Sequence, residues 1–404
     1  MNVKKMVKTA AIAAILGTGF VPSAYADVSV EDVKCTQRYP WNGLVDIEYT
    51  IACDDPEAEI YVNPVGFNGD TGLTVFPTHF TGDGATNTVK AGKHTMVWDA
   101  KADLGNLFAS KNFQIKMYAG KKLSRYIVID ISGGTEAESY PIRHSIEGPN
   151  LSDDTCRTTE IWMRLIPPGT FMMGSPEDEL GRDNSAGETF CKVHITKPFY
   201  MGVFEVTQAQ FSNVSGENNL SSKLPQVKKN LNDIWRNGAV QPSDMGALST
   251  SFIGKLRTKT QKYGFCLPSE AQWEYACRAG TVAALYNGYD LMSMNGDDNL
   301  NRIARYAVNG NAPAEVGSYE PNALGLYDML GNVNEWCRDS WYSSGRENEM
   351  IDPQVGKGTG WMVIKGGNYG DLANRCRSAA RRDEFTDHSL QWVGFRLCAT
   401  GDLQ

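Results

Sequence analysis

The feature that most constrains the fold is how little regular periodicity the second part of the chain shows. Between residues 156 and 404, helical patterns are found only at 207–214, 249–261 and 269–279. The last of these begins with a capping box, because the side chains of Ser269 and Gln272 are placed to accept hydrogen bonds from each other's backbone N–H groups. Short apolar runs and long loops rich in Gly, Asn and Asp make up the rest. A domain of this kind must hold its loops by buried polar contacts, metal ions or disulfides.

The preceding part, residues 27–135, has the period of β-strands instead. Apolar residues alternate with polar ones, as in a half-buried strand, at Val45, Ile47, Tyr49 and Ile51. Further strands, each bounded by turn-forming residues, are predicted at 59–63, 94–99, 113–119 and 125–131. Several short strands without a helix predict an all-β sandwich of immunoglobulin type, which more often serves as a spacer or docking module than as a catalyst. The whole chain is therefore expected to be α+β, with this sandwich in front of an irregular second domain.

The first 26 residues are predicted to be a cleaved signal peptide. Three lysines precede the apolar stretch 9–21, and Ala24 and Ala26 then supply the small residues that a signal peptidase reads. The alternative, a membrane anchor, needs about 20 apolar residues, which is more than this stretch contains. No later segment is apolar enough to span a membrane, so the mature protein is expected to be secreted or periplasmic. The whole chain has 39 basic and 47 acidic residues, and the mature part contains no basic block, which argues against nucleic acid as a partner.

The boundary between the two parts is expected in a polar segment. Residues 136–155 show no periodicity, so they are predicted to be a linker in front of a domain at 156–404. Cys35 and Cys53 flank the first hairpin of the sandwich, and export would place them where disulfides persist. A disulfide is therefore predicted between these two cysteines.

A series of short motifs runs through the second part. They are IPPGTFMMGS at 166–175, KPFYMG at 197–202, EVTQ at 205–208, LPSEAQWEYACRAG at 267–280, NALGLYDMLGNVNEW at 322–336, KGGNY at 365–369, CRSA at 376–379 and GFR at 394–396. Each motif is a weak signal by itself, but their order from about residue 159 to residue 400 resembles that of the sulfatase-modifying factor family. The best-known members of this family are formylglycine-generating enzymes.

The resemblance implies a compact variant of the C-type-lectin-like fold, poor in regular structure and stabilised by calcium. It also implies a chemistry, because the best-known members oxidise a sulfatase cysteine to formylglycine with O2 and a copper ion held by two thiolates. Other branches are ergothioneine-type enzymes with a three-histidine iron site, and pyoverdine-maturation proteins without the thiolate pair. The second domain contains only His194 and His388, too few for the iron site.

The positions of the family's copper site differ in this sequence. By the family's spacing, Asp371 occupies the first thiolate position, and Cys376 lies on or beside the second. Asn368 replaces the serine of the Gly-Gly-Ser motif, and Asn334 replaces a tryptophan of the preceding block. Copper(I) needs soft ligands such as thiolates. These positions therefore predict that copper is not bound, and they leave the catalytic residues unassigned.

A calcium site is implied by the same resemblance. The family uses the positions that match Asp328, Gly331, Val333 and Glu335, which here offer two carboxylates and two backbone carbonyls around a Gly-Asn turn. Oxygen sets of this kind are the ligands that Ca²⁺ prefers. The alternative is a turn in which Asp328 caps the backbone and Glu335 forms a salt bridge.

The resemblance also suggests disulfides in the second domain. Cys277 matches the cysteine of the family's Tyr-x-Cys position, and a disulfide with Cys376 is expected. Cys266 and Cys398 are a second candidate pair.

A basic cluster borders the family's substrate groove, with Arg375, Arg377, Arg381, Arg382 and Arg396. Arg377 and Arg381 are predicted to bind an acidic ligand such as a sulfated or uronic glycan. The alternative is a salt-bridged surface.

Three functional hypotheses follow. The first is an exported, calcium-binding member of the family that binds a peptide or glycan in the family's groove, or catalyses a different reaction there. The second is an O2-dependent oxidoreductase that generates formylglycine from a sulfatase cysteine. The third is an adhesion or structural module of the cell envelope, which the sandwich would suit.

Overall fold

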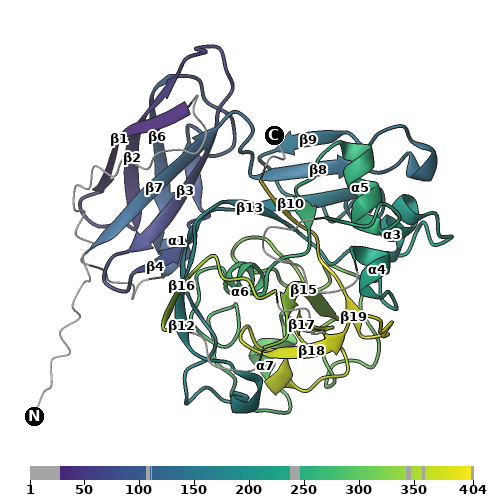
Figure 1. Cartoon of the computed structure of the whole chain (residues 1–404). Coiled ribbons are helices and arrows are strands. Elements are labelled where there is room, and N and C mark those ends of the chain that lie inside the picture. Colours follow the sequence, from purple (N-terminus) through teal and green to yellow (C-terminus); the bar gives the residue numbers. More distant parts are fainter. Residues whose placement is uncertain are drawn as a thin grey trace, which may run out of the picture. The chain divides into compact units, whose positions relative to one another are not determined.

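A computed structural model of the chain describes residues 28–105, 110, 112–236, 246–342, 347–356 and 360–401. The expected signal peptide, residues 1–26, lies outside the described residues. The chain divides into two compact units, unit 1 (Met1–Ser124) and unit 2 (Arg125–Gln404). Figure 1 colours the chain from purple at its N-terminus to yellow at its C-terminus.

Unit 1 is built mainly from strands. Its described elements are β1 (Val28–Gln37), β2 (Leu44–Cys53), β3 (Tyr61–Asn68), β4 (Leu73–Val75), β5 (Phe80–Gly82), β6 (Gly92–Asp99), α1 (Ala100–Leu104) and β7 (Phe113–Gly120). The strands form two antiparallel sheets with the orders β1-β2-β6-β5 and β4-β3-β7. Both sheets contribute to one apolar core.

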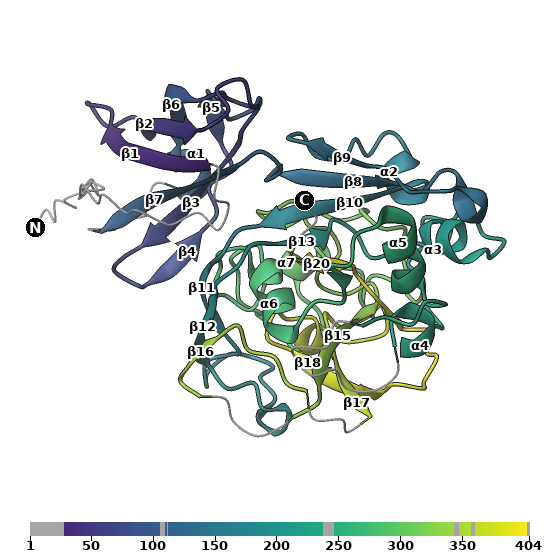
Figure 2. The ribbon, with the colours of Figure 1, turned by 45° about the horizontal axis from the view of Figure 1, so that its top comes forward.

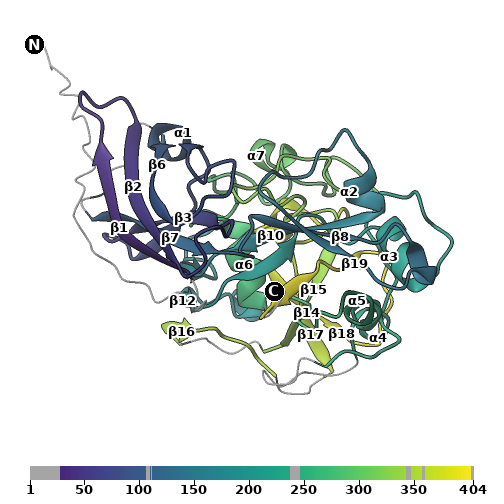
Figure 3. The same cartoon turned by 90° about the horizontal axis from the view of Figure 1, so that it is seen from above.

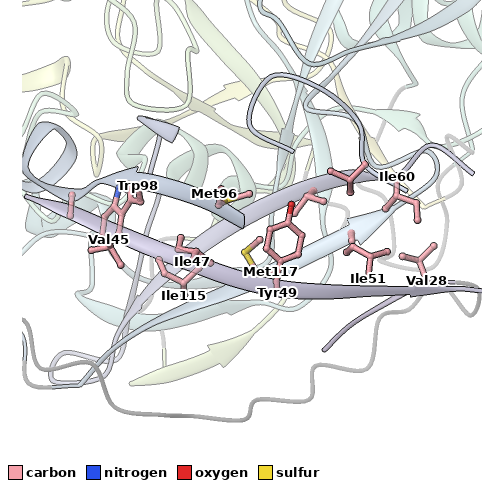
Figure 4. Packing of buried hydrophobic residues seen from close by; sticks show 14 of the residues in the cluster. Val28, Val45, Ile47, Tyr49, Ile51, Ile60, Met96, Trp98, Ile115 and Met117 are labelled. Atoms are coloured by element: carbon pink, nitrogen blue, oxygen red, sulfur yellow. The ribbon is translucent and has the colours of Figure 1, made fainter. Parts of the chain in front are cut away.

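The core of unit 1 confirms the alternation predicted for its second strand. The apolar side chains of β2 are buried, namely Val45, Ile47, Tyr49 and Ile51. They lie among apolar side chains of β6 and β7, as Figure 4 shows. Trp98 of β6 stacks on Phe113 of β7 with ring centroids 5.4 Å apart. Burying one large apolar side chain contributes about 1.5–3 kcal/mol, so this layer stabilises unit 1.

The disulfide predicted between Cys35 and Cys53 is wrong. In the register of β1 and β2, Cys35 lies opposite Ile47, whereas Cys53 lies opposite Val28. The two thiols are therefore at different ends of the strand pair, and both are free. Burial raises the pKa of Cys35 to about 11, so this thiol stays protonated at neutral pH.

Unit 2 is strand-rich with few helices. Its strands are β8 (Tyr126–Asp130), β9 (Ile142–Ser145), β10 (Glu160–Ile166), β11 (Gly169–Met173), β12 (Cys191–Ile195), β13 (Phe199–Gly202), β14 (Phe265–Cys266), β15 (Asn334–Ser340), β16 (Glu349–Ile351), β17 (Trp361–Lys365), β18 (Arg381–Phe385), β19 (Val393–Gly394) and β20 (Cys398–Thr400). Its helices are α2 (Thr155–Thr158), α3 (Gln208–Ser215), α4 (Leu231–Ile234), α5 (Phe252–Thr260), α6 (Glu270–Arg278) and α7 (Asp298–Asn301), with short 3-10 turns η1 (Gly134–Glu136), η2 (Asn184–Ala186) and η3 (Ala373–Arg375). None of the described helices is long and apolar enough to cross a membrane.

The three helical segments predicted from the sequence are confirmed as α3, α5 and α6. α6 begins with the predicted capping box, in which Ser269 and Gln272 accept hydrogen bonds from each other's backbone N–H groups. All residues of α6 are buried, including its charged ones. Figure 3 shows α3, α4 and α5 together at one side of unit 2, where Phe211 stacks on Phe252 at a centroid distance of 5.2 Å.

The described strands of unit 2 form three sheets. The largest has the strand order β14-β20-β13-β10-β8-β9, the second β18-β17-β15-β19 and the third β11-β12-β16. In the second sheet, β15 pairs antiparallel with β17 and parallel with β19. β15, β17 and β18 lie close together in Figures 1 and 2.

The largest sheet corrects the predicted domain boundary and linker. Residues 125–131 are expected in the sandwich and residues 136–155 in a linker, but these segments contain β8 and β9. The two strands pair with each other, and β8 also pairs with β10. Ile127, Val128 and Ile129 are fully buried there. The boundary lies at Ser124. The sequence prediction placed it too late because an apolar strand pattern does not reveal which sheet the strand joins.

The last described strand lies inside the largest sheet. β20 pairs with β13 on one side and with β14 on the other. Cys398 lies directly opposite Met201 of β13 and Cys266 of β14. Three segments that are far apart in the sequence therefore meet at β20.

Candidate functional site

A tight turn precedes β15 and carries the residues predicted to bind calcium. Asp328, Gly331 and Asn332 all have left-handed backbone conformations, with φ values of 55°, 74° and 56°. At position 331 only glycine fits, because a Cβ there would lie 2.2 Å from the carbonyl oxygen of Arg305. Strain of this kind persists only when surrounding contacts hold the turn in place.

Asp328 brings an unpaired carboxylate oxygen into this turn. Its Oδ2 atom accepts a hydrogen bond from the N–H of Gly317 at 2.6 Å. Oδ1 is buried and has no hydrogen-bond partner among the described residues. Burial raises the pKa of Asp328 to about 6. An ionised oxygen in such a position needs a positive partner.

Two glutamates lie near Asp328, and one of them has an arginine partner. Glu335 is bound by the guanidinium of Arg396, with 2.6 Å between Oε1 and Nη2, and by the indole N–H of Trp273. Glu205 accepts hydrogen bonds from the Val333 N–H and from the Asn332 side chain. Burial, followed by the charges of Asp328 and Glu335, raises the pKa of Glu205 well above its usual range.

Glu205 is not among the site residues predicted from the sequence, because one glutamate in the motif at 205–208 produces no recognisable spacing. Three acids thus share this region with the guanidinium of Arg396, and the charge of Arg157 also acts on Asp328. The imbalance provides a physical reason for a cation.

Of the residues predicted to bind calcium, Asp328, Gly331 and Val333 belong to this turn, whereas Glu335 lies in β15 and is paired with Arg396. Among the described residues, no three His, Cys, Asp or Glu side chains form a group able to hold a metal ion. A cation would therefore depend on the free oxygen of Asp328 together with backbone carbonyls, a donor set that Ca²⁺ accepts. Both contacts of the predicted alternative are present, since Asp328 caps the Gly317 N–H and Glu335 forms an ion pair.

A small cavity lies beside the turn, at β15, β17, β18 and the loop after β17. Its described lining consists of Asn334, Ile364, Lys365, Gly366, Gly367, Asp371, Arg375, Ala380, Arg381 and Arg382. Two of the four positions predicted for the family's catalytic region, Asn334 and Asp371, line this cavity. The other two, Asn368 and Cys376, are neighbours of lining residues.

Asp371, at the first thiolate position, is held by hydrogen bonds on both oxygens. Oδ2 accepts from the backbone N–H of Asn368 at 3.2 Å and from its side-chain amide at 2.6 Å. Nη1 of Arg382 lies 3.0 Å from Oδ1 and 3.2 Å from Oδ2. The carboxylate is therefore fixed by donors from Asn368 and Arg382, which leaves little capacity for another ligand.

Cys376 is the thiol nearest to this carboxylate, and it is fully buried. Burial, followed by the charge of Asp371, raises the pKa of Cys376 far above that of an ordinary cysteine. A protonated thiol is a poor metal ligand, because metals bind the thiolate.

The disulfide predicted between Cys277 and Cys376 is wrong. Both thiols are free. The sulfur of Cys277 lies 3.7 Å from the hydroxyl of Ser378, whereas that of Cys376 adjoins Gly367. Position 378 holds a serine where a bridge to Cys277 would need a thiol.

Asn334 stands at the start of β15 and is 2% exposed. Its backbone N–H donates to the carbonyl of Trp392 at 2.9 Å, which fixes the residue between β15 and the segment before β19. The side-chain nitrogen Nδ2 is buried and has no partner in the described part of the chain. Unpaired buried donors are rare in native proteins, so this amide is a candidate contact for a ligand.

The prediction that Arg377 and Arg381 bind an acidic ligand is wrong. Arg377 is fully buried and forms ion pairs with Glu179 at 2.5 Å and Glu188 at 2.9 Å. Arg381 is bound by both oxygens of Glu270, at 2.6 and 2.9 Å, and lies over the ring of Trp341. Both side chains hold the domain together, because their charges are already neutralised inside it.

Arg375 and Arg382 are the more accessible members of the basic cluster. Their side chains are 34% and 39% exposed, and both line the cavity. Arg375 contacts Asp183 through Nη1 at 3.0 Å, and Arg382 contacts Asp371 through Nη1. The contacts described for each guanidinium thus use one of its nitrogens.

The histidines of unit 2 do not build a metal centre in the described part of the chain. His194 of β12 contacts Thr170 and Glu349, while His388 contacts Glu384. His144 lies on β9 and belongs to unit 2 because of the corrected boundary. A three-histidine iron site is therefore not formed by the described residues.

Comparisons with known proteins agree with the order of the motifs. The sequence model of the sulfatase-modifying factor enzyme 1-like domain matches residues 149–400. The formylglycine-generating enzyme of Mus musculus is 26% identical over 312 residues, which cover 66% of this chain and 82% of that protein. The formylglycine-generating enzyme of Streptomyces coelicolor is 38% identical over 150 residues, covering 34% of this chain and 47% of that protein. The solved structure of PvdO from Pseudomonas aeruginosa is similar with a TM-score of 0.45 and 24% identity, and the match covers 59% of this chain and 94% of PvdO.

Proposed function

Because this chain belongs to the sulfatase-modifying factor enzyme 1-like domain family, we propose that it is a binding member of that family, in which the copper site has become a peptide-binding site. The observation that carries this proposal is the state of the two thiolate positions. Asp371 is an ion-paired carboxylate at the first position, and Cys376 is a buried thiol with a raised pKa beside it. Copper(I) requires soft thiolate ligands, and this pair does not offer them.

The main alternative is that the chain still oxidises a sulfatase cysteine to formylglycine. The experiment is to incubate the purified full chain with copper, O2 and a Cys-x-Pro-x-Arg peptide, and to analyse the peptide by mass spectrometry. We expect unmodified cysteine and no copper retained after desalting. An aldehyde at the peptide cysteine would refute the binding proposal. The matched variant Asp371→Cys returns a thiol to the first position, and we expect it to retain more copper(I) than the natural chain.

We also propose a structural calcium ion at the turn before β15. Asp328 would supply a side-chain oxygen and Gly331 and Val333 would supply carbonyls, while Glu335 stays paired with Arg396. The unpaired Oδ1 atom of Asp328 and the surplus of buried acids support this assignment. When bound, the ion would neutralise these acids and hold the strained turn that carries Asn334.

The two units suggest how the protein is deployed. We propose that residues 1–26 are removed during export to the periplasm or the exterior, and that unit 1 is an immunoglobulin-type sandwich that docks the protein in the cell envelope. Unit 2 would be the C-type-lectin-like variant implied by its family. N-terminal sequencing of the protein recovered from culture medium or periplasm tests the first point, and the expected first residue is Asp27. Recovery of an intact N-terminus would contradict cleavage.

A further inference from the structure

We propose that the cavity beside Asn334 binds the carboxylate group of an acidic peptide, and that Asn334, Arg375 and Arg382 recognise it. The inference rests on the proposed function, because it treats the family site as a binding site. It goes beyond that function by naming the chemical group that is bound and the residues that select it.

The cavity has a surplus of hydrogen-bond donors. Asp371 is the one carboxylate among the described lining residues, and both its oxygens already accept hydrogen bonds. Two lining cations are neutralised by acids that are not among the described lining residues, Lys365 by Glu274 at 3.0 Å and Arg381 by Glu270. The donors that remain therefore favour a ligand that brings an acceptor with negative charge.

The amide of Asn334 is unpaired. This side chain is almost completely buried and lines the cavity, and its Nδ2 donor has no partner among the described residues. A carboxylate oxygen in the cavity would satisfy it. A neutral amide group would satisfy it less well, because a charged acceptor forms the stronger hydrogen bond.

Two guanidinium groups at the cavity have nitrogen atoms that make no described contact. Within the described part of the chain, Arg375 and Arg382 each contact one acid through Nη1, which leaves Nε and Nη2 for a ligand. The planar fork of arginine matches the two oxygens of a carboxylate. Both side chains are about a third exposed, which allows a ligand to approach from solvent.

An apolar rim beside the cavity favours a peptide as the source of the carboxylate. Met294 and Leu372 are 46% and 45% exposed. The N–H of Asn374 donates to the carbonyl of Met294 at 3.0 Å, so this rim adjoins the segment that carries Asp371 and Arg375. Methionine side chains adapt to varied apolar groups, as on peptide-binding surfaces. Such a rim suits the side chains that flank an acidic residue.

The test uses matched pools of acetylated hexapeptides and the immobilised full chain. The flanking positions are randomised, and the pools differ only in a central Glu or Gln, both with amidated ends. A further Gln pool has a free C-terminal carboxylate. We expect at least tenfold more peptide retained from the Glu pool than from the amidated Gln pool. Preference for the free-end pool would support the proposal with the C-terminus as the source of the carboxylate.

Variants identify the site. Asn334→Leu keeps the size but removes the donor, and Arg375→Gln removes one guanidinium; each is expected to lower retention of the Glu pool about tenfold. The matched control is Arg302→Gln, which removes an exposed ion-paired arginine outside the cavity lining and should leave retention unchanged. Equal thermal unfolding midpoints show that the variants are folded.

Three results would overturn the inference. They are equal retention of all three peptide pools, retention that neither cavity variant changes, and preferential retention of a uronic-acid oligosaccharide. If all three pools are retained equally and both cavity variants lower that retention, the preference for a carboxylate is refuted, but the proposed binding function is not. Conversion of the sulfatase peptide to an aldehyde would refute the binding function itself.

Discussion

At the scale of single residues, buried charge pairs replace regular secondary structure as the framework of unit 2. Arg377 joins Glu179 and Glu188, Arg381 joins Glu270, and Arg396 joins Glu335. Removing one partner of such a pair leaves an uncompensated buried charge, which costs more than the pair itself contributes.

Arg377→Met is therefore expected to lower the free energy of unfolding of unit 2 by about 3–5 kcal/mol. The physical reason is that Glu179 and Glu188 would lose their shared counter-charge while remaining buried. Urea denaturation followed by tryptophan fluorescence measures the change. Arg302→Gln, in an exposed pair with Glu320, serves as the control and should cost less than about 1 kcal/mol. A similar small loss for Arg377→Met would show that the buried network is not structural.

Asp339 should make stability depend on pH. Burial, followed by the charge of Glu270, raises the pKa of Asp339 to about 6 from the usual 3.8. The folded state therefore binds this proton more tightly than the unfolded state, and stability is lost as the pH rises from about 4 to about 6. The loss amounts to about 3 kcal/mol, because one pKa unit corresponds to about 1.4 kcal/mol.

The measurement is the difference in unfolding free energy between the natural chain and Asp339→Asn at several pH values. The amide that this substitution introduces does not titrate, so the natural chain should lose stability relative to the variant across this range. A difference that is constant from pH 4 to pH 7 would contradict the prediction.

Calcium should stabilise the protein through Asp328. At a free concentration one hundred times the dissociation constant, a ligand specific to the folded state adds about 2.7 kcal/mol. Thermal unfolding midpoints are compared after treatment with chelator and after adding CaCl2. Asp328→Ala should abolish the increase, while Asp46→Asn, at an exposed pair in unit 1, should retain it. If calcium does not raise the unfolding midpoint of the natural chain, the proposed calcium site is refuted.

At the scale of elements, strand register decides which cysteines can meet. Cys266 and Cys398 lie directly opposite each other on β14 and β20, and both are fully buried. Opposed residues of antiparallel strands have Cα atoms about 4.5–5.5 Å apart, within the range of disulfides. Nη1 of Arg338 lies 3.2 Å from the sulfur of Cys266. Burial opposes ionisation of Cys266, but the hydrogen bond from Cys398 and the charges of Arg338 and Arg257 outweigh it and lower the pKa to about 6.

Refolding with glutathione disulfide should therefore couple Cys266 to Cys398. Two protein thiols would be oxidised while one glutathione disulfide is reduced to two glutathione thiols. Alkylation under denaturing conditions followed by mass spectrometry would detect the loss of these two thiols, and the cross-link should stabilise the chain by about 3–5 kcal/mol. Cys398→Ser should keep Cys266 open to alkylation. If Cys266 and Cys398 stayed free while Cys277 and Cys376 became bonded, the pairing expected from the register of β14 and β20 would be contradicted.

The sequence was sufficient for features that depend on local patterns. The alternation in β2, the capped helix α6 and the order of the family motifs all follow from neighbouring residues. Contacts between distant segments decide which sheet β8 joins, which residue lies opposite Cys35 and whether Arg377 is buried. An arginine is expected at the surface until its buried glutamate partners are known. The sequence spacing likewise gives no connection between Glu205 and Asp328. The family positions in the sequence indicated the region around Asn334. Only the three-dimensional structure shows that its Nδ2 donor has no partner among the described residues.

At the scale of the whole molecule, the corrected boundary predicts which fragments fold. A fragment of residues 125–404 should be folded, whereas residues 136–404 should not, because the second lacks β8 and exposes the strands beside it. Circular dichroism and resistance to proteolysis compare the two fragments, with residues 28–124 as a control that should fold by itself. Cooperative unfolding of the 136–404 fragment would show that β8 is dispensable.

The place of β20 inside the largest sheet has a consequence for how the protein is made. Cys398–Thr400 is synthesised after β13 and β14, and these two strands can be bridged only once it has left the ribosome. Unit 1 consists of earlier segments and can fold while synthesis continues, whereas the largest sheet of unit 2 must wait until β20 has been synthesised. During that interval two strand edges are exposed, and such edges invite association with other chains. A nascent chain stalled shortly before Cys398 should therefore depend on chaperones far more than one in which β20 has already left the ribosome.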